Sequence, residues 1–126
     1  MDDSRGTIQG MDVCELEGAG LDSWVARSED FEIAHCSETG CYVHTFWRQS
    51  HPFFYRPLRY QPSQNWSQGG PLLDRLTHMG LEVAWIEAGG KVACTLGPFC
   101  MKGEHLLQAA MRCYVASVWG EHLPDE

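Results

Sequence analysis

Basic residues are scarce in this 126-residue chain, which has nine Lys and Arg against seventeen Asp and Glu and a formal net charge of −8. A surface of that charge repels phosphate backbones, so we expect no direct DNA or RNA binding. No apolar run approaches the roughly 20 residues that a membrane-spanning helix needs. The amino end also lacks the charged and then apolar regions of a signal peptide. We therefore expect a cytoplasmic protein with no membrane partner.

Recognisable catalytic and phosphate-binding motifs are missing as well. The chain contains no Gly-x-Ser-x-Gly elbow, no Walker phosphate loop, no dinucleotide fingerprint and no His-Glu-x-x-His. We expect a protein without enzymatic activity and without a cofactor. The six cysteines are expected to be thiols rather than disulfides. A zinc site is a minor alternative, because the spacing of its candidates is not that of a zinc knuckle. These candidates are His35, Cys36, Cys41 and His44.

The composition is that of one folded domain, with 44% hydrophobic and 21% charged residues. A chain of this length forms a single core. Residues 1–10 have little to bury and are predicted to be a flexible N-terminal extension. Residues 11–126 are predicted to form the domain.

Hydrophobic periodicity predicts three helices. The spacing of Leu21, Trp24 and Val25 predicts a first helix that starts near Ala19. Pro71 suits the first position of a second helix, which ends at Gly80. A broad apolar stripe over residues 104–119, followed by Gly120, predicts the third.

Two hairpins are predicted between these helices. Residues 31–36 and 41–47 form the first, and residues 81–88 and 91–96 form the second, with Gly89-Gly90 as its turn. The fold class is therefore α+β: a small single domain in which three helices pack on an antiparallel sheet of about four strands. Most tryptophans within these elements are expected to lie in the core. They are Trp47, Trp85 and Trp119.

The irregular segment 49–70 is the candidate functional region, because such long loops in small domains are often functional. Four arginines make it locally basic: Arg48, Arg56, Arg59 and Arg75. Gly69 and Gly70 precede the predicted helix start, where bare amides attract anions. Tyr60 or Trp66 could stack on a base. Equally, the glycines could form only a turn, and Trp66 could fill the core.

The resulting candidate ligand site combines aromatic, hydroxyl, guanidinium and glycine residues. We expect Ser63 to donate a hydrogen bond and Arg112 to neutralise ligand charge. Trp24 is the helical tryptophan expected nearest the pocket. The full set is Trp24, Arg59, Tyr60, Ser63, Trp66, Gly69, Gly70 and Arg112.

Three stretches resemble a family of small tailed-phage and prophage proteins that includes the NinX-type proteins. They are residues 16–26 (Leu-x-Gly-x-x-Leu-Asp-x-Trp-Val-Ala), 60–71 (Tyr-x-Pro-Ser-x-x-Trp-x-x-Gly-Gly-Pro) and 109–120 (Ala-Ala-Met-Arg-x-Tyr-Val-Ala-Ser, ending at Gly120). The chain departs from the family at His105-Leu106, where Thr-Pro is expected, and over residues 31–59. The resemblance implies phage origin and action in the host cytoplasm, but no established reaction.

We therefore expect a phage accessory protein that binds and sequesters a small anionic, nucleotide-like ligand, such as a host anti-phage defence signal. An alternative is an inhibitor that docks onto a host defence or nucleic-acid-binding protein through Phe53, Phe54 and Tyr55. The sequence leaves the oligomeric state open, and a homo-oligomer is one option, since ligand pockets often lie at interfaces.

Overall fold

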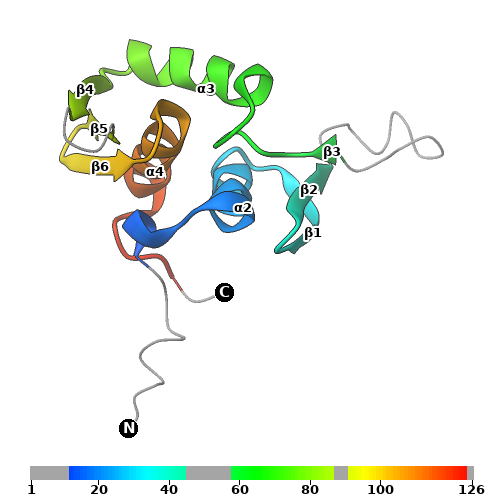
Figure 1. The fold of residues 1–126 in the computed structure, drawn as a ribbon. Coiled ribbons are helices and arrows are strands. Elements are labelled where there is room, and N and C mark those ends of the chain that lie inside the picture. The colour runs from blue at the N-terminus through cyan, green and yellow to red at the C-terminus, as the bar shows by residue number, and fades with distance from the viewer. Residues whose placement is uncertain (1–11, 45–57, 87–90, 125–126) are drawn as a thin grey trace, which may run out of the picture.

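The structure of the protein is a computed structural model that describes residues 12–44, 58–86 and 91–124. The helices in these ranges are the 3-10 helix η1 (Val13–Glu15) and the α-helices α2 (Gly18–Ser28), α3 (Trp66–His78) and α4 (Leu106–Trp119) (Figure 1). The strands are β1 (Glu32–Ser37), β2 (Gly40–His44), β3 (Leu58–Arg59), β4 (Glu82–Ile86), β5 (Lys91–Leu96) and β6 (Phe99–Gly103). Several predicted features lie outside the described residues: the N-terminal extension, strand residues 45–47 and 87–88, the Gly89-Gly90 turn, and residues 48–57 of the candidate loop with Phe53, Phe54 and Tyr55.

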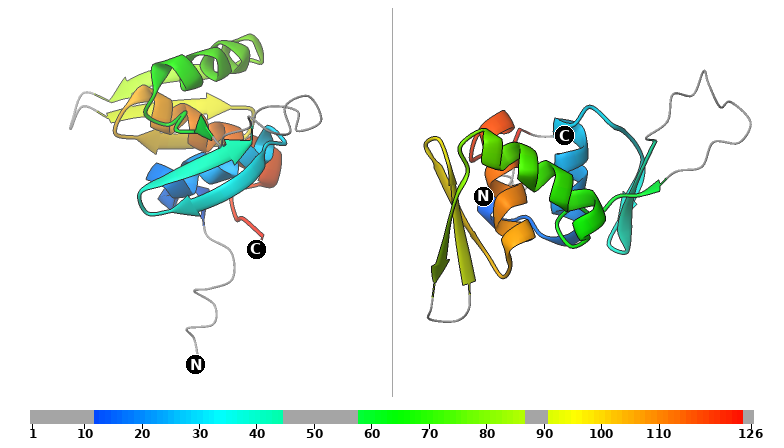
Figure 2. Two further views of the ribbon diagram at one scale, coloured as in Figure 1. Left: turned by 90° about the vertical axis from the view of Figure 1, so that its right-hand side faces the viewer. Right: turned by 90° about the horizontal axis from the view of Figure 1, so that it is seen from above.

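The strands form two antiparallel sheets of three strands each, ordered β1-β2-β3 and β4-β5-β6. The α+β class and the three predicted helices are confirmed, whereas one sheet of about four strands is wrong. The two sheets lie at opposite ends of the molecule, with α2 and α4 between them and α3 across one side (Figure 2). Helix α2 packs on β1 and β2, and α4 packs on β5 and β6. Each hairpin thus has a helix of its own to cover it and does not join the other hairpin in one sheet.

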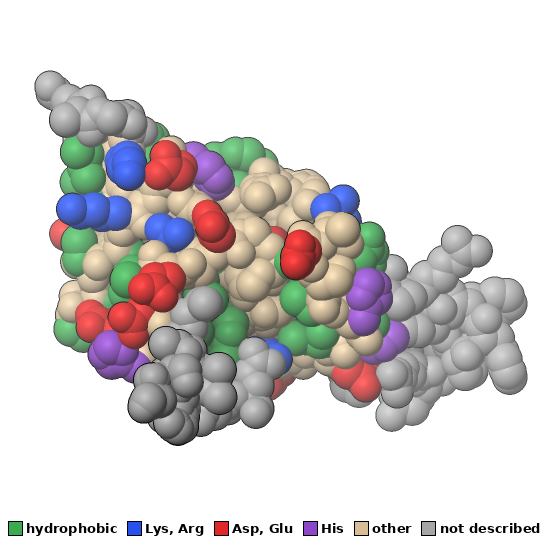
Figure 3. All heavy atoms as spheres, turned by 60° about the horizontal axis from the view of Figure 1, so that its bottom comes forward, with side chains coloured by type: hydrophobic (Ala, Val, Ile, Leu, Met, Phe, Trp, Pro, Cys, Tyr) green, Lys and Arg blue, Asp and Glu red, His purple; other side chains and the backbone are tan. Residues whose placement is uncertain are grey.

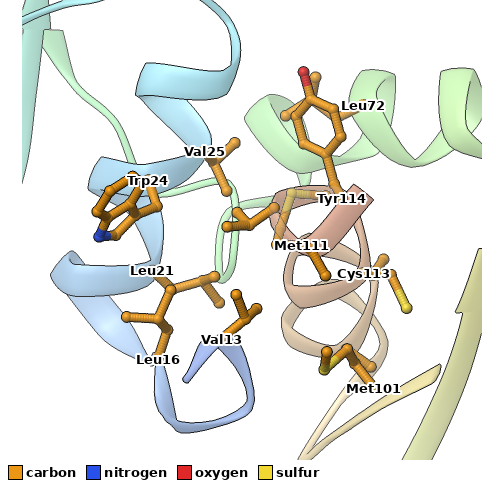
Figure 4. Close-up of a cluster of buried hydrophobic side chains, with 14 of the residues drawn as sticks. Val13, Leu16, Leu21, Trp24, Val25, Leu72, Met101, Met111, Cys113 and Tyr114 are labelled. Carbon is orange, nitrogen blue, oxygen red and sulfur yellow. The ribbon is translucent and has the colours of Figure 1, made fainter. Parts of the chain in front are cut away.

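The core lies where α2 and α4 meet. Leu21 and Val25 of α2 and Met111 of α4 are all fully buried and point toward one another (Figure 4). Val13 of η1 closes this cluster from below in the same view. Each such side chain contributes about 1.5–3 kcal/mol by leaving water, so the contact between the two helices is a substantial part of the packing.

Helix α3 begins at Trp66 and not at Pro71, so the predicted start is wrong. Asn65 caps the helix: its side-chain oxygen accepts a hydrogen bond from Ser67 N at 2.8 Å. Asn is among the strongest N-cap residues, so the helix starts at this cap although Pro71 forgoes one helical hydrogen bond. Gly69 therefore lies inside the helix, and its amide donates to Asn65 O at 2.7 Å.

Strand β6 was not predicted. It follows β5 through a tight turn at Gly97, whose φ of 60° favours glycine, and Pro98. The strand is short, and its residue Gly103 lies against α4 so closely that a Cβ atom would be 2.6 Å from Ala109 N. A five-residue strand that ends in a packing glycine carries little periodicity to recognise.

Trp85 is not a core residue, contrary to the sequence-based expectation. Its side chain is 68% exposed, and Trp119 is also partly exposed. Trp47 lies outside the described residues. The reason is that α4 covers β5 and β6 and leaves β4 uncovered. None of the helices in the described ranges is both long and apolar enough to cross a bilayer.

Candidate functional site

The extended segment that runs from β3 into the turn before α3 separates two hollows. Leu58 pairs with Val43 of β2, and Tyr60 N donates to Cys41 O at 2.8 Å, so the segment stays extended beyond β3. Successive side chains of an extended chain point to opposite sides. Leu58 and Tyr60 accordingly line one hollow, and Arg59 and Gln61 line the other.

The larger hollow, which we call the groove, has a volume of about 340 Å³. Helix α3 forms one wall, and the segment after α2 together with β3 forms the other. The rings of Phe31 and Tyr60 meet edge to face with their centroids 5.3 Å apart. Tyr60 is buried and so contributes only a small part of the lining. The groove is lined by Glu29, Phe31, Leu58, Tyr60, Gln68, Pro71, Leu72 and Arg75.

An ion pair between Arg75 and Glu29 lies in the lining of the groove. Arg75 donates to both carboxylate oxygens of Glu29 and, at 3.2 Å, to the hydroxyl of Tyr114, which itself donates to Glu29. Hydrogen bonding to Glu29 raises the pKa of Arg75. Burial raises the pKa of both Tyr60 and Tyr114, so these phenols stay neutral. Three of the five N–H donors of Arg75 are used in these contacts, and its side chain is about half exposed.

The smaller hollow, which we call the polar cavity, has a volume of about 100 Å³ and lies at the start of α2. Gly18 and Ala19 of the first turn line it, and the side chain of the N-cap residue Glu17 makes no capping hydrogen bond. Arg59 lines it too, and its guanidinium donates to Thr39 O at 2.7 Å. Helix amides and an arginine are groups that attract negative charge.

Two carboxylates oppose that attraction. Asp22 lines the polar cavity and is buried, and its side chain accepts a hydrogen bond from Ser63 N at 2.9 Å. Burial raises the pKa of Asp22 to about 6, against the opposing effects of the Ser63 hydrogen bond and the Arg59 charge. Glu38 also lines the cavity. With two acidic groups against one arginine, the polar cavity is the poorer place for an anion.

The predicted anion site at Gly69 and Gly70 is wrong in its geometry, because neither glycine lies at a helix start. Gly69 is a packing residue: a Cβ atom there would be 2.2 Å from Pro62 O and 3.0 Å from Leu107 Cδ2. Gly70 has open surroundings, with Trp66 Cε3 at 3.8 Å as the nearest atom to such a Cβ.

The other predicted site residues are dispersed. Tyr60 lines the groove, Arg59 lines the polar cavity, and Ser63 holds Asp22. Trp66 is exposed at the start of α3 and lines neither hollow. The binding roles of Arg59 and Tyr60 stay predictions.

Trp24 and Arg112 hold the fold together and line neither hollow. Trp24 is buried, meets the Trp119 ring edge to face at 5.3 Å and carries the Arg27 guanidinium 4.5 Å from its own centroid. Arg112 donates to Leu16 O at 2.9 Å and to Lys102 O at 2.6 Å. It thereby ties α4 to the chain before α2 and to β6.

Sequence reasoning missed most of the groove. Gln68, Pro71, Leu72 and Arg75 follow the i, i+3, i+4, i+7 spacing of one helix face. The sequence analysis did not recognise this face because it predicted that the helix starts at Pro71. Phe31 and Leu58 belong to short segments, and only the tertiary structure determines which way their side chains face. Among the described residues, no group of three or more His, Cys, Asp or Glu could hold a metal ion.

The comparisons with known proteins identify the family. The family described as bacteriophage P22, NinX, matches residues 12–118, which extend from just before η1 almost to the end of α4. No curated protein matches the chain. The match includes both hollows and the whole α2–α4 core, so the chain belongs to the NinX family of bacteriophage P22.

Proposed function

We propose that this phage accessory protein binds and sequesters a small anionic, nucleotide-like ligand in the groove. The observation that carries the proposal is an apolar hollow of about 340 Å³ with an arginine in its lining. Sites for small molecules have volumes of roughly 300–1,000 Å³ and combine apolar walls with a few polar groups. The groove has both properties.

The ligand's planar part would lie against the apolar walls. Leu58, Phe31 and Pro71 offer flat or aliphatic surfaces, and Leu58 is 45% exposed at the rim. A nucleobase there would lose apolar surface to water at about 25 cal/mol per Å². The walls therefore select for a ring and not for a free anion alone.

The ligand's negative charge would lie at Arg75. The two N–H donors that Glu29 and Tyr114 leave unused are available to a phosphate. The bidentate contact with Glu29 fixes the guanidinium, so little side-chain entropy is lost when the phosphate arrives. Because Glu29 already neutralises part of this charge, we expect a ligand with few phosphates.

Binding without turnover is the form of activity we propose. Glu29 is engaged by Arg75 and Tyr114, and Tyr60 and Tyr114 are neutral, so the groove offers no ready base. A phage protein that withholds a nucleotide-derived defence signal would need only to bind it. The ligand should then be recovered unchanged after the protein is denatured by heat.

Calorimetry with a panel of cyclic mononucleotides, cyclic dinucleotides and ADP-ribose derivatives tests the proposal. The variant Leu58→Glu places a carboxylate at the groove rim and should weaken binding at least about tenfold, or about 1.4 kcal/mol. Trp66→Glu is the matched control, because Trp66 is also an exposed apolar residue but does not line the groove. It should bind as the wild type does.

Three results would contradict the proposal. The first is no heat of binding from any compound with folded protein. The second is an equal loss of affinity in the two variants, which would move the site away from the groove. The third is a new product in place of the ligand, which would indicate an enzyme.

A further inference from the structure

Strand β4 is an edge of its sheet. It is hydrogen-bonded to β5 alone, and among the described elements its only extensive contact is with β5. An edge strand presents a row of unpaired backbone N–H and C=O groups, which natural proteins usually protect by charge, proline or a covering element. In β4 the only charged residue is Glu82, and there is no proline.

One face of β4 lies on the same side of the sheet as the buried residues of β5. This face is apolar and exposed. Val83 is opposite Cys94, and Trp85 is opposite Val92, in the antiparallel register. Residues directly opposite one another point to the same face of a sheet. Cys94 and Val92 are fully buried, whereas Val83 is 40% and Trp85 is 68% exposed. The core face of the sheet therefore continues beyond the helix that covers it.

We propose that β4 pairs antiparallel with β4 of a second copy of this chain, about a two-fold axis at Ala84, to give a continuous six-stranded sheet. This axis is the one that pairs all five residues of the strand. Val83 then lies opposite Trp85 of the second copy, and Trp85 opposite its Val83. These cross-strand pairs join an aromatic and a β-branched side chain, which is a favourable combination in sheets.

The alternative two-fold axes pair the strand less well. An axis at Val83 would place Trp85 opposite Leu81, which is buried and precedes the strand. An axis at Trp85 would place two tryptophans directly opposite each other and extend the pairing beyond the described strand. A two-fold axis that passes between two residues would place residues that point to opposite faces directly opposite each other. A regular antiparallel sheet does not allow this pairing.

The charges on the outer face fit the same axis. Glu82 would be opposite Ile86 of the second copy, and Ile86 is paired with Lys91 within each sheet. Glu82 and the second copy's Lys91 would thus be two strands apart, about 9.6 Å. Among the five described residues of the strand, the pairing places no two carboxylates directly opposite each other. Repulsion between carboxylates matters in a chain whose net charge is −8 and whose acidic side chains are spread over the face that Figure 3 shows.

A second copy suits this edge because the strand is complementary to itself. Across the two-fold, the four side chains of Val83 and Trp85 from both copies gather on one face and shield one another from water. The pairing uses residues of the chain that line neither the groove nor the polar cavity. Dimerisation and ligand binding can therefore fail independently.

Oligomeric state tests the proposal first. Light scattering after size-exclusion chromatography, repeated over a range of concentrations, should show a dimer for the wild type. Trp85→Lys and Val83→Lys should each give a monomer, since they bury a charge at the new interface. Trp66→Lys is the matched control and should stay dimeric. Trp66 is 57% exposed at the start of α3, whereas β4 follows the other end of that helix. Circular dichroism verifies that each variant is folded.

Cross-linking tests the register. In a background in which the exposed Cys14, Cys36 and Cys100 are changed to Ser, Ala84→Cys should form a disulfide between copies when oxidised with diamide. The two thiols then lose two hydrogens to the diamide, which becomes the hydrazine. Glu82→Cys should cross-link far less, because its neighbour across the axis is Ile86. A wild type that is monomeric at every concentration, or a dimer that survives Trp85→Lys without an Ala84→Cys cross-link, overturns the proposal.

Discussion

The two sheets have similar strands but differ in what lies beneath them. Under β1–β3, α2 buries Asp22, which accepts a hydrogen bond from the buried Ser63, and both hollows adjoin this half. Under β4–β6, α4 buries Val92 and Cys94, and no residue of these four elements lines either hollow. Both hollows thus adjoin the half that has the buried polar contact and the short third strand.

Gly69 connects these two halves, and its replacement should have the largest effect. In Gly69→Ala the new methyl group would meet Pro62 O at 2.2 Å, a backbone atom that has no room to yield. We expect the free energy of unfolding, measured by urea denaturation, to fall by about 3 kcal/mol. Gly70→Ala is the control and should raise it by about 0.5–1 kcal/mol, as Ala does inside helices. Similar effects at both positions would show that the halves do not meet at Gly69.

The buried carboxylate in the first half predicts a dependence on pH. Asp22 has a pKa of about 6 in the folded protein against an ordinary value of 3.8. The folded state therefore holds the proton more tightly, and the free energy of unfolding falls as pH rises between these two values. Above pH 6 the charged group costs about 1–3 kcal/mol.

Asp22→Asn keeps an acceptor for Ser63 N and removes that charge. The variant should be more stable than the wild type by about 1–3 kcal/mol above pH 6 and should lose this advantage below pH 4. Thermal or urea denaturation of both proteins across this range measures the difference. A difference that stays constant with pH would show that Asp22 does not titrate in this window.

A pair of valines compares the sheets directly. Val43 in β2 is fully buried under α2, and Val83 in β4 is largely uncovered. Val43→Ala should lower the free energy of unfolding by about 2 kcal/mol, through lost burial and a small cavity. Val83→Ala should change it by less than about 0.5 kcal/mol in dilute solution. Equal losses would mean that β4 is covered in solution even at low concentration.

A smaller effect than at Val43 is expected at Tyr114 of α4, which contacts the ion pair in the groove lining. Tyr114→Phe removes the hydroxyl that joins Glu29 and Arg75, and should cost about 1 kcal/mol of stability. Because Arg75 keeps its bidentate contact with Glu29, ligand affinity should change only slightly. A large loss of affinity with little loss of stability would assign the hydroxyl a direct role in binding.

Local patterns in the sequence predicted most elements but not their assembly. Helix α4 and the β4–β5 hairpin were predicted because their hydrophobic residues recur with a regular period and each pattern ends at glycine. The helix start at Trp66 was missed because Gly69, Gly70 and Pro71 are typical of a turn, while the cap at Asn65 depends on one side chain. Of the predicted site residues, Tyr60 lines the groove, whereas Trp24 and Arg112 line neither hollow and make contacts within the fold.

The sequence by itself determined the α+β class, the three helices and the family, because each depends on residues close together along the chain. The tertiary structure alone decided that the hairpins form separate sheets, that Trp85 is bare and that the groove contains Arg75. These features depend on which helix covers which strand, and the free energy of that choice comes from contacts between residues far apart in sequence. No short-range pattern records such contacts.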